Sequence, residues 1–136
     1  MIYSIFVLVS LLFRQSDTNA LQVHIHGISS NEGNIMIAVF DEEEHFLTEN
    51  THHGGVFQVN GHATQICSLT LKPGRYAVSV FHDLNGDGTL NTNFFGIPKE
   101  PYGFSNDARG RFGPPDYEAV VFEFTDDRQQ INITLK

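Results

Sequence analysis

The sequence lacks several features that would place it in a particular class of protein. It contains one cysteine and no tryptophan. A lone cysteine excludes an internal disulfide, so the fold must be stable without covalent cross-links. Basic residues are also scarce, with 8 Lys and Arg against 16 Asp and Glu and a net charge of −8. A surface of that sign repels phosphate backbones, so we expect no nucleic-acid partner.

Long apolar runs are missing as well, apart from the amino terminus. Residues 2–13 are almost entirely apolar and are followed by polar residues and then Thr18-Asn19-Ala20. This pattern predicts an export signal peptide over residues 1–20, cleaved near Ala20. No run approaches the roughly 20 apolar residues of a spanning helix, so we expect no membrane insertion. The predicted product is a secreted or periplasmic protein whose single domain covers residues 21–136.

Alternation of apolar and polar residues dominates wherever the chain is regular. Leu21, Val23 and Ile25 alternate with polar residues, as expected for a strand with one buried face. Seven short strands are predicted, at residues 21–26, 34–40, 56–59, 63–71, 76–81, 118–124 and 130–135. No segment has a convincing amphipathic helical pattern, and the stretch 41–54 is either a loop or one short helical turn. The sequence therefore predicts an all-β fold, a two-sheet sandwich of about seven strands.

Turn residues separate these strands. Asn60-Gly61 predicts a hairpin between the third and fourth strands, and Lys72-Pro73-Gly74 predicts a tight turn into the fifth. Cys67 shares its alternating face with two leucines, which predicts a buried and unreactive thiol. The predicted core contains ten inward-facing residues: Val23, Ile25, Ile37, Val39, Val78, Val80, Phe122, Phe124, Ile131 and Ile133.

The span 83–116 is rich in proline and glycine and has no sustained periodicity. Loops longer than about 15 residues are rare in compact domains unless they are functional or disordered. The aromatic residues of this span argue against disorder: Phe94, Phe95, Tyr102, Phe104 and Phe112. We therefore expect a long ordered loop at one end of the sandwich, with a miniature core beneath it. The alternative is that these aromatics form a surface on which a ligand stacks.

Within this span, residues 83–91 carry oxygen-bearing groups at alternate positions. The five residues are Asp83, Asn85, Asp87, Thr89 and Asn91. In a tight loop, alternate side chains converge on one centre, Gly88 permits the sharp turn, and position seven offers its backbone carbonyl. Hard cations require oxygen ligands of this kind. The spacing predicts a calcium site of modest affinity formed by these five residues.

The loop nevertheless differs from an EF-hand. Phe94 stands at position twelve, where that motif has a bidentate Glu, and a strand rather than a helix precedes the loop. We therefore expect another carboxylate of the long loop to complete the site, and Glu100, Asp107 and Asp116 are the candidates. The alternative is an Asn-Gly-Asp-Gly turn that is stabilised only by hydrogen bonds between side chains and backbone.

Several segments of the chain carry a family resemblance. They are residues 74–78, 81–88, 91–93 and 96–106, together with Gly113-Pro114-Pro115 and the closing strands. With these segments the chain resembles the bacterial domain-of-unknown-function family 2141. The resemblance implies an exported small β-domain and no particular activity.

A second, more distant resemblance concerns the strand and the Asp-x-Asn-x-Asp-Gly loop that follows it. These resemble the calcium loops of B-type repeats in Gram-positive surface adhesins. That resemblance implies a prealbumin-like or immunoglobulin-like sandwich and a bound calcium ion. Those loops usually carry a later Asp where this chain has Asn91.

The histidines allow two other functional interpretations, a transition-metal site and a catalytic base. There are seven, and a zinc or copper site would draw on four groups of them: His24, His26, His52-His53 and His62. His82 precedes Asp83 and is a candidate general base, whereas Ser105 lacks the surroundings of a nucleophile elbow and is read as a turn residue.

The leading hypothesis is an exported, non-catalytic binding or structural module with a calcium-stabilised loop. Its expected ligand is a glycan, a peptide or an envelope protein. The alternative is a small periplasmic or secreted enzyme or metal-handling protein that uses His82 and the loop carboxylates.

Overall fold

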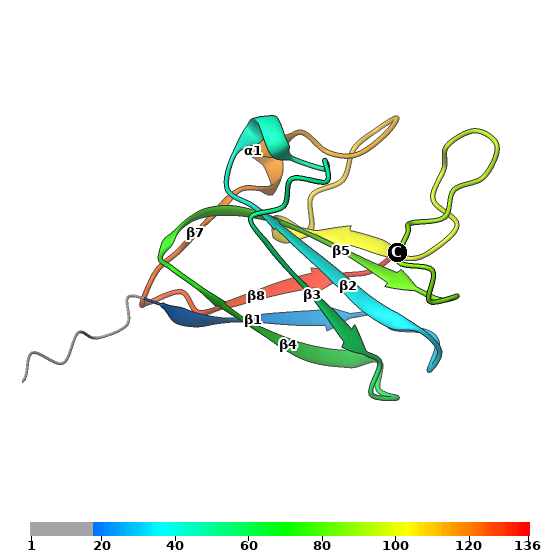
Figure 1. The fold of residues 1–136 in the computed structure, drawn as a ribbon, viewed down its shortest axis with the longest axis horizontal. Helices are drawn as coiled ribbons and strands as arrows, with labels where there is room; N and C mark the ends of the chain where they lie inside the picture. The colour runs from blue at the N-terminus through cyan, green and yellow to red at the C-terminus, as the bar shows by residue number, and fades with distance from the viewer. Residues whose placement is uncertain (1–17) are drawn as a thin grey trace, which may run out of the picture.

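The computed structural model describes residues 18–136, and these fold into two β-sheets packed face to face (Figure 1). The smaller sheet has the order β4-β1-β8, with strands β4 (Thr64–Leu71), β1 (Asn19–His26) and β8 (Gln130–Thr134). Strand β1 is antiparallel to β4 and parallel to β8. The predicted all-β sandwich is confirmed.

The larger sheet has five strands and is centred on β2 and β5. Its order is β3 (His53–Gln58), β2 (Asn34–Phe40), β5 (Gly74–Asp83) and β6 (Tyr102–Phe104), and β7 (Phe122–Phe124) also pairs with β5. One edge of β5 pairs with β2, while β6 and β7 occupy successive parts of the other edge. Within residues 18–136, helical structure is limited to three short pieces: η1 (Glu43–His45), η2 (Ser105–Asp107) and α1 (Tyr117–Val120).

The core between the sheets follows from the alternation in the sequence. Every second residue of β1, β4 and β8 is buried, and the same holds for the inward face of β2. All ten residues predicted for the core are buried. Cys67 is buried with them, and desolvation raises the pKa of its thiol to about 11, against a smaller opposing effect of the Gln65 hydrogen bond. The thiol is therefore protonated at neutral pH and unreactive, as predicted.

One predicted strand was partly wrong, and one observed strand was not predicted. The strand predicted over residues 118–124 begins as helix α1, in which Tyr117 and Val120 are both buried, three residues apart. Only Phe122–Phe124 is a strand. The short strand β6 was not predicted, because three residues are too few to display an alternating pattern.

The predicted hairpin at Asn60-Gly61 is also wrong. Gly61 does adopt the left-handed conformation, with φ 85°. However, β3 pairs with β2 and β4 pairs with β1, so this turn carries the chain from one sheet to the other. A turn motif fixes where the chain reverses, whereas the pairing of the flanking strands depends on which sheet buries their apolar faces.

The long loop lies at one end of the sandwich and also runs across the outer face of the larger sheet (Figure 1). On that face a second apolar cluster forms, with these buried members: Phe40, Ala77, Phe104, Tyr117 and Val120. The miniature core is thus confirmed for Phe104. It is wrong for Phe94, Phe95 and Phe112, which are 98%, 82% and 102% exposed.

The predicted signal peptide falls mostly on residues 1–17, outside the described residues. Strand β1 begins at Asn19, and Asn19 and Ala20 pair with Leu71 and Thr70. Within residues 18–136 no helix has the length and apolar character needed to cross a membrane.

Candidate metal site

The carboxyl end of β5 places Asp83 next to the loop that follows it. Successive strand residues point to opposite faces, so His82 is directed toward the core side while Asp83 lies on the other face. Asp83 is nevertheless only 1% exposed. Gly33 lies against its backbone with φ 78°, and a Cβ at Gly33 would be 1.9 Å from the Asp83 carbonyl oxygen. The turn before β2 therefore packs closely against the backbone of Asp83.

Hydrogen bonds give the loop after β5 a defined shape. The amide of Gly88 donates to Asp83 Oδ2 at 2.8 Å. The amide of Thr89 donates to Asp87 Oδ1 at 3.0 Å, and Asn91 Nδ2 donates to Asp87 Oδ2 at 3.0 Å. Asn85 contributes a weaker pair of contacts with Asp87, each at 3.3 Å. Four of the five predicted ligand residues thus form one network around Asp87, and the fifth, Asp83, adjoins it through the Gly88 amide.

These contacts also set the charge state of Asp87. The Thr89 amide, and after it the Asn91 side chain, hold the pKa of this carboxyl below its usual range. Donors that stabilise the ionised form lower a carboxyl pKa. Asp87 is therefore an anion at neutral pH and remains one in mildly acidic solution.

Glu100 is the carboxylate that joins the loop from outside. Its Oε2 accepts from the Leu84 amide at 2.6 Å and its Oε1 accepts from the Asn91 amide at 2.9 Å, so it connects both ends of the loop. The side chain is only 6% exposed. Carboxylate oxygens of Asp83, Asp87 and Glu100 all lie within 4.8 Å of one another.

The other two candidate carboxylates lie elsewhere. Asp107 accepts a hydrogen bond from the Thr134 amide at 2.8 Å, and Asp116 is exposed at the start of α1. Among residues 18–136, the three-carboxylate cluster is the one place where three His, Cys, Asp or Glu side chains converge. Of the three carboxylates considered from the sequence, the structure brings Glu100 to the loop.

Two buried oxygens at this site have no hydrogen-bond partner in the described structure. They are Asp83 Oδ1 and Asn91 Oδ1. None of the three carboxylates forms an ion pair with a Lys, Arg or His side chain of residues 18–136. An unpaired buried carboxylate oxygen is costly, and two further carboxylates nearby add like-charge repulsion. A cation held between these oxygens would offset both costs.

The histidine alternatives do not gather in the described structure. His82 is fully buried, and its Nε2 lies 2.6 Å from the Glu32 carbonyl oxygen, away from the carboxylate cluster. The His26 ring nitrogens lie 3.2 Å from Thr64 Oγ1 and 3.0 Å from Asn132 Oδ1. These histidines therefore make hydrogen bonds within the fold instead of sharing a centre.

Ser105 has a structural role that the sequence did not reveal. It is fully buried, and its Oγ accepts from the Val78 amide at 3.0 Å and donates to the Val120 carbonyl at 2.6 Å. The side chain thereby fastens η2 to both β5 and α1. Sequence reasoning placed Ser105 in a turn, and the hydroxyl makes no contact with the carboxylate cluster.

Comparison with known proteins gives one match. No curated protein and no solved structure matches the chain. A family model described as "uncharacterized protein conserved in bacteria (DUF2141)" matches residues 23–132, which include β2 through β7, half of β1, most of β8 and the whole carboxylate cluster. The chain belongs to this bacterial DUF2141 family.

Proposed function

We propose that this protein is an exported, non-catalytic binding or structural module whose loop 83–91 is stabilised by calcium. The observation that carries the proposal is the buried Asp83 carboxylate, whose Oδ1 has no hydrogen-bond partner and which lies beside the carboxylates of Asp87 and Glu100. A bound cation would compensate all three negative charges at once.

Calcium fits this set of donors better than other common metals. The available groups are carboxylate and amide oxygens, and no Cys or His side chain belongs to the cluster. Hard cations select oxygen ligands, whereas zinc and copper favour nitrogen and sulfur. Calcium also accepts the irregular coordination of a loop, while magnesium requires a near-octahedral arrangement. Asn91 Oδ1 and the Thr89 carbonyl are the neutral ligands that we propose.

The proposed affinity is modest and suits an extracellular protein. Calcium sites of extracellular modules have dissociation constants of about 10⁻⁴ to 10⁻³ M. With Glu100 the site has three carboxylates instead of the two in the loop itself, so we expect the tighter end of that range. Export, which the apolar segment 2–13 supports, would bring the protein to compartments where calcium is plentiful.

Thermal unfolding with and without calcium tests the proposal. At a calcium concentration ten times the dissociation constant, binding to the folded state alone contributes about 1.4 kcal/mol of stability. For a domain of this size, the melting temperature should rise by about 4–8 °C. Asp87→Ala should lose most of this rise, because it removes a charged ligand.

A matched variant controls for the loss of one surface charge. Asp127→Ala removes an exposed carboxylate that lies in the turn before β8 and is not part of the cluster, and this variant should keep the full response to calcium. If calcium shifts the melting temperature equally in Asp87→Ala and in the natural chain, the ion does not bind at this loop.

A further inference from the structure

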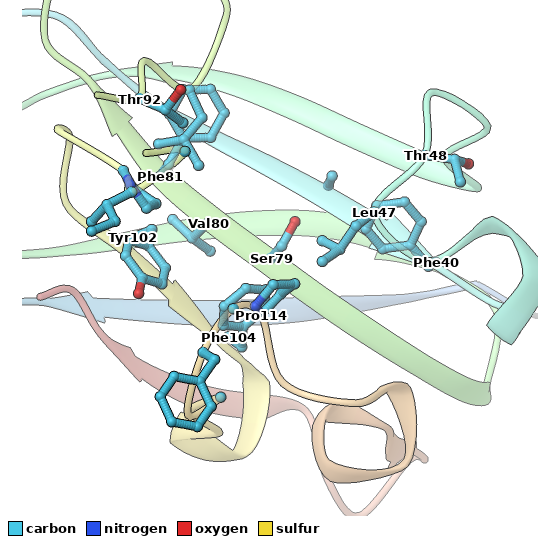
Figure 2. A pocket seen from close by; sticks show the side chains of 18 of the residues that line it. Phe40, Leu47, Thr48, Ser79, Val80, Phe81, Thr92, Tyr102, Phe104 and Pro114 are labelled. Atoms are coloured by element: carbon cyan, nitrogen blue, oxygen red, sulfur yellow. The ribbon is translucent and has the colours of Figure 1, made fainter. Parts of the chain in front are cut away.

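A groove opens on the outer face of the larger sheet, separate from the carboxylate cluster. Its floor consists of outward-facing side chains of β2, β5 and β6, and Figure 2 shows Phe40, Ser79, Phe81, Tyr102 and Phe104 turned toward it. The volume is about 810 Å³. Pockets for small organic ligands commonly measure about 300–1,000 Å³ and are mainly apolar. The groove has the size and lining of such a pocket.

Two loop segments form walls of this groove. One is the hairpin 91–99, in which the Lys99 amide donates to the Asn91 carbonyl at 2.8 Å and Asn93 Oδ1 accepts from two amides of the tip. The other is the segment 110–114. The hairpin stem is thus held by main-chain hydrogen bonds, so this wall has a defined shape before any ligand binds.

Exposed apolar side chains are concentrated around the groove. Of the seven large hydrophobic residues that are exposed in the described structure, four line it: Leu47, Phe95, Ile97 and Phe112. Single exposed apolar residues are ordinary, but a contiguous group beside a cavity marks a binding surface. A ligand with a substantial apolar body would cover these side chains.

The charge of the lining narrows the class of ligand. Arg111 is its one charged residue, and no Asp, Glu or His contributes to it. No hydrogen bond or ion pair engages the Arg111 side chain within residues 18–136. In a protein of net charge −8, an apolar groove with one unpaired cation is complementary to an apolar molecule that carries one negative charge.

We propose that this groove binds an anionic amphiphile, a single molecule with an apolar chain and one carboxylate or similar group that pairs with Arg111. The apolar chain would lie over the aromatic floor. A membrane surface is a poorer partner, because anionic headgroups repel a protein of this net charge. The proposal names a ligand for the binding role proposed above, and it does not depend on the ion, since Arg111 and the floor lie outside the carboxylate cluster.

Calorimetric titration with dodecanoate, below its micelle concentration and in a calcium-free buffer because calcium precipitates fatty-acid anions, tests this assignment. We expect saturable binding of one molecule per chain. Arg111→Gln should weaken dodecanoate binding roughly fivefold, as expected for loss of one exposed ion pair, and leave binding of the neutral 1-dodecanol unchanged. Phe112→Ser should weaken both ligands roughly tenfold, because it removes apolar contact area.

Matched controls separate the groove from general surface effects. Lys72→Gln removes an exposed cation and Val56→Ser removes an exposed apolar side chain, both outside the lining, and neither should alter dodecanoate binding.

Absence of saturable binding, or equal binding of dodecanoate to Arg111→Gln and to the natural chain, overturns the proposal. Capture by phosphatidylglycerol vesicles without binding of monomeric dodecanoate also overturns it, in favour of a membrane surface. Calcium-dependent melting is measured separately, so failure here leaves the metal proposal standing.

Discussion

Phe124→Ala should lower the free energy of unfolding by about 3–5 kcal/mol, the range for truncating a buried Phe. Phe124 is fully buried in the core between the two sheets. It lies on β7 and pairs with Gly74 at the start of β5. The truncation removes the ring from the core and leaves a cavity, and both effects destabilise the fold. Urea unfolding of the natural and mutant chains measures the loss.

Phe94→Ala is the matched control for that experiment. It makes the same chemical change at a residue that is 98% exposed, so the free energy of unfolding should change by no more than about 0.5 kcal/mol. A loss in Phe124→Ala as small as that in Phe94→Ala would mean that β7 does not contribute its inward face to the core.

Gly33→Ala should destabilise the protein by about 2–5 kcal/mol. Two costs add: a non-glycine residue at φ 78° is strained by about 1–2 kcal/mol, and the new Cβ would overlap the Asp83 carbonyl at 1.9 Å, an overpacking that costs about 1–3 kcal/mol. Because Asp83 must shift to relieve the overlap, the variant should also lose part of the calcium-dependent rise in melting temperature.

Gly61→Ala is the control that separates the cost of backbone strain from the cost of the overlap between the new Cβ and neighbouring atoms. Gly61 has φ 85°, but its nearest neighbour for a new Cβ is Asn31 Oδ1 at 4.0 Å. This variant should cost only the strain, about 1–2 kcal/mol, and its response to calcium should be that of the natural chain. Equal losses in the two glycine variants would contradict the close contact between the turn and Asp83.

The sandwich could be predicted because its strands obey simple local rules. Alternation of apolar and polar residues identifies both a strand and its buried face, and the ten predicted core residues, which lie on β1, β2, β5, β7 and β8, are all buried. Which strands pair with each other was harder to predict from the sequence. Asn60-Gly61 fixes a reversal of the chain, but whether the flanking strands join one sheet or two depends on contacts across the whole domain.

At the candidate site, too, the local features could be predicted from the sequence and the long-range contacts could not. The spacing of Asp83, Asn85, Asp87 and Asn91 is local, and the sequence alone identified this loop as a unit. The sequence offered three carboxylates that could complete the site and could not choose Glu100 among them. Glu100 reaches the loop because the hairpin 91–99 brings the chain back to it, and that contact is not visible in the sequence. The groove floor was beyond sequence reasoning, since it combines outward faces of β2, β5 and β6 that look like ordinary strand residues.

Calcium titration followed by ¹H–¹⁵N nuclear magnetic resonance tests the central claim most directly, because it locates the ion on the chain. We predict that the amide resonances of Gly88, Asn91 and Glu100 shift together and saturate with a dissociation constant of about 10⁻⁴ to 10⁻³ M. Resonances of the exposed acidic run Glu42-Glu43-Glu44 should stay unchanged. Amides of the loop that do not move at calcium concentrations of about ten times that range, or shifts spread over the acidic surface without saturation, would contradict a calcium site formed by Asp83, Asp87 and Glu100.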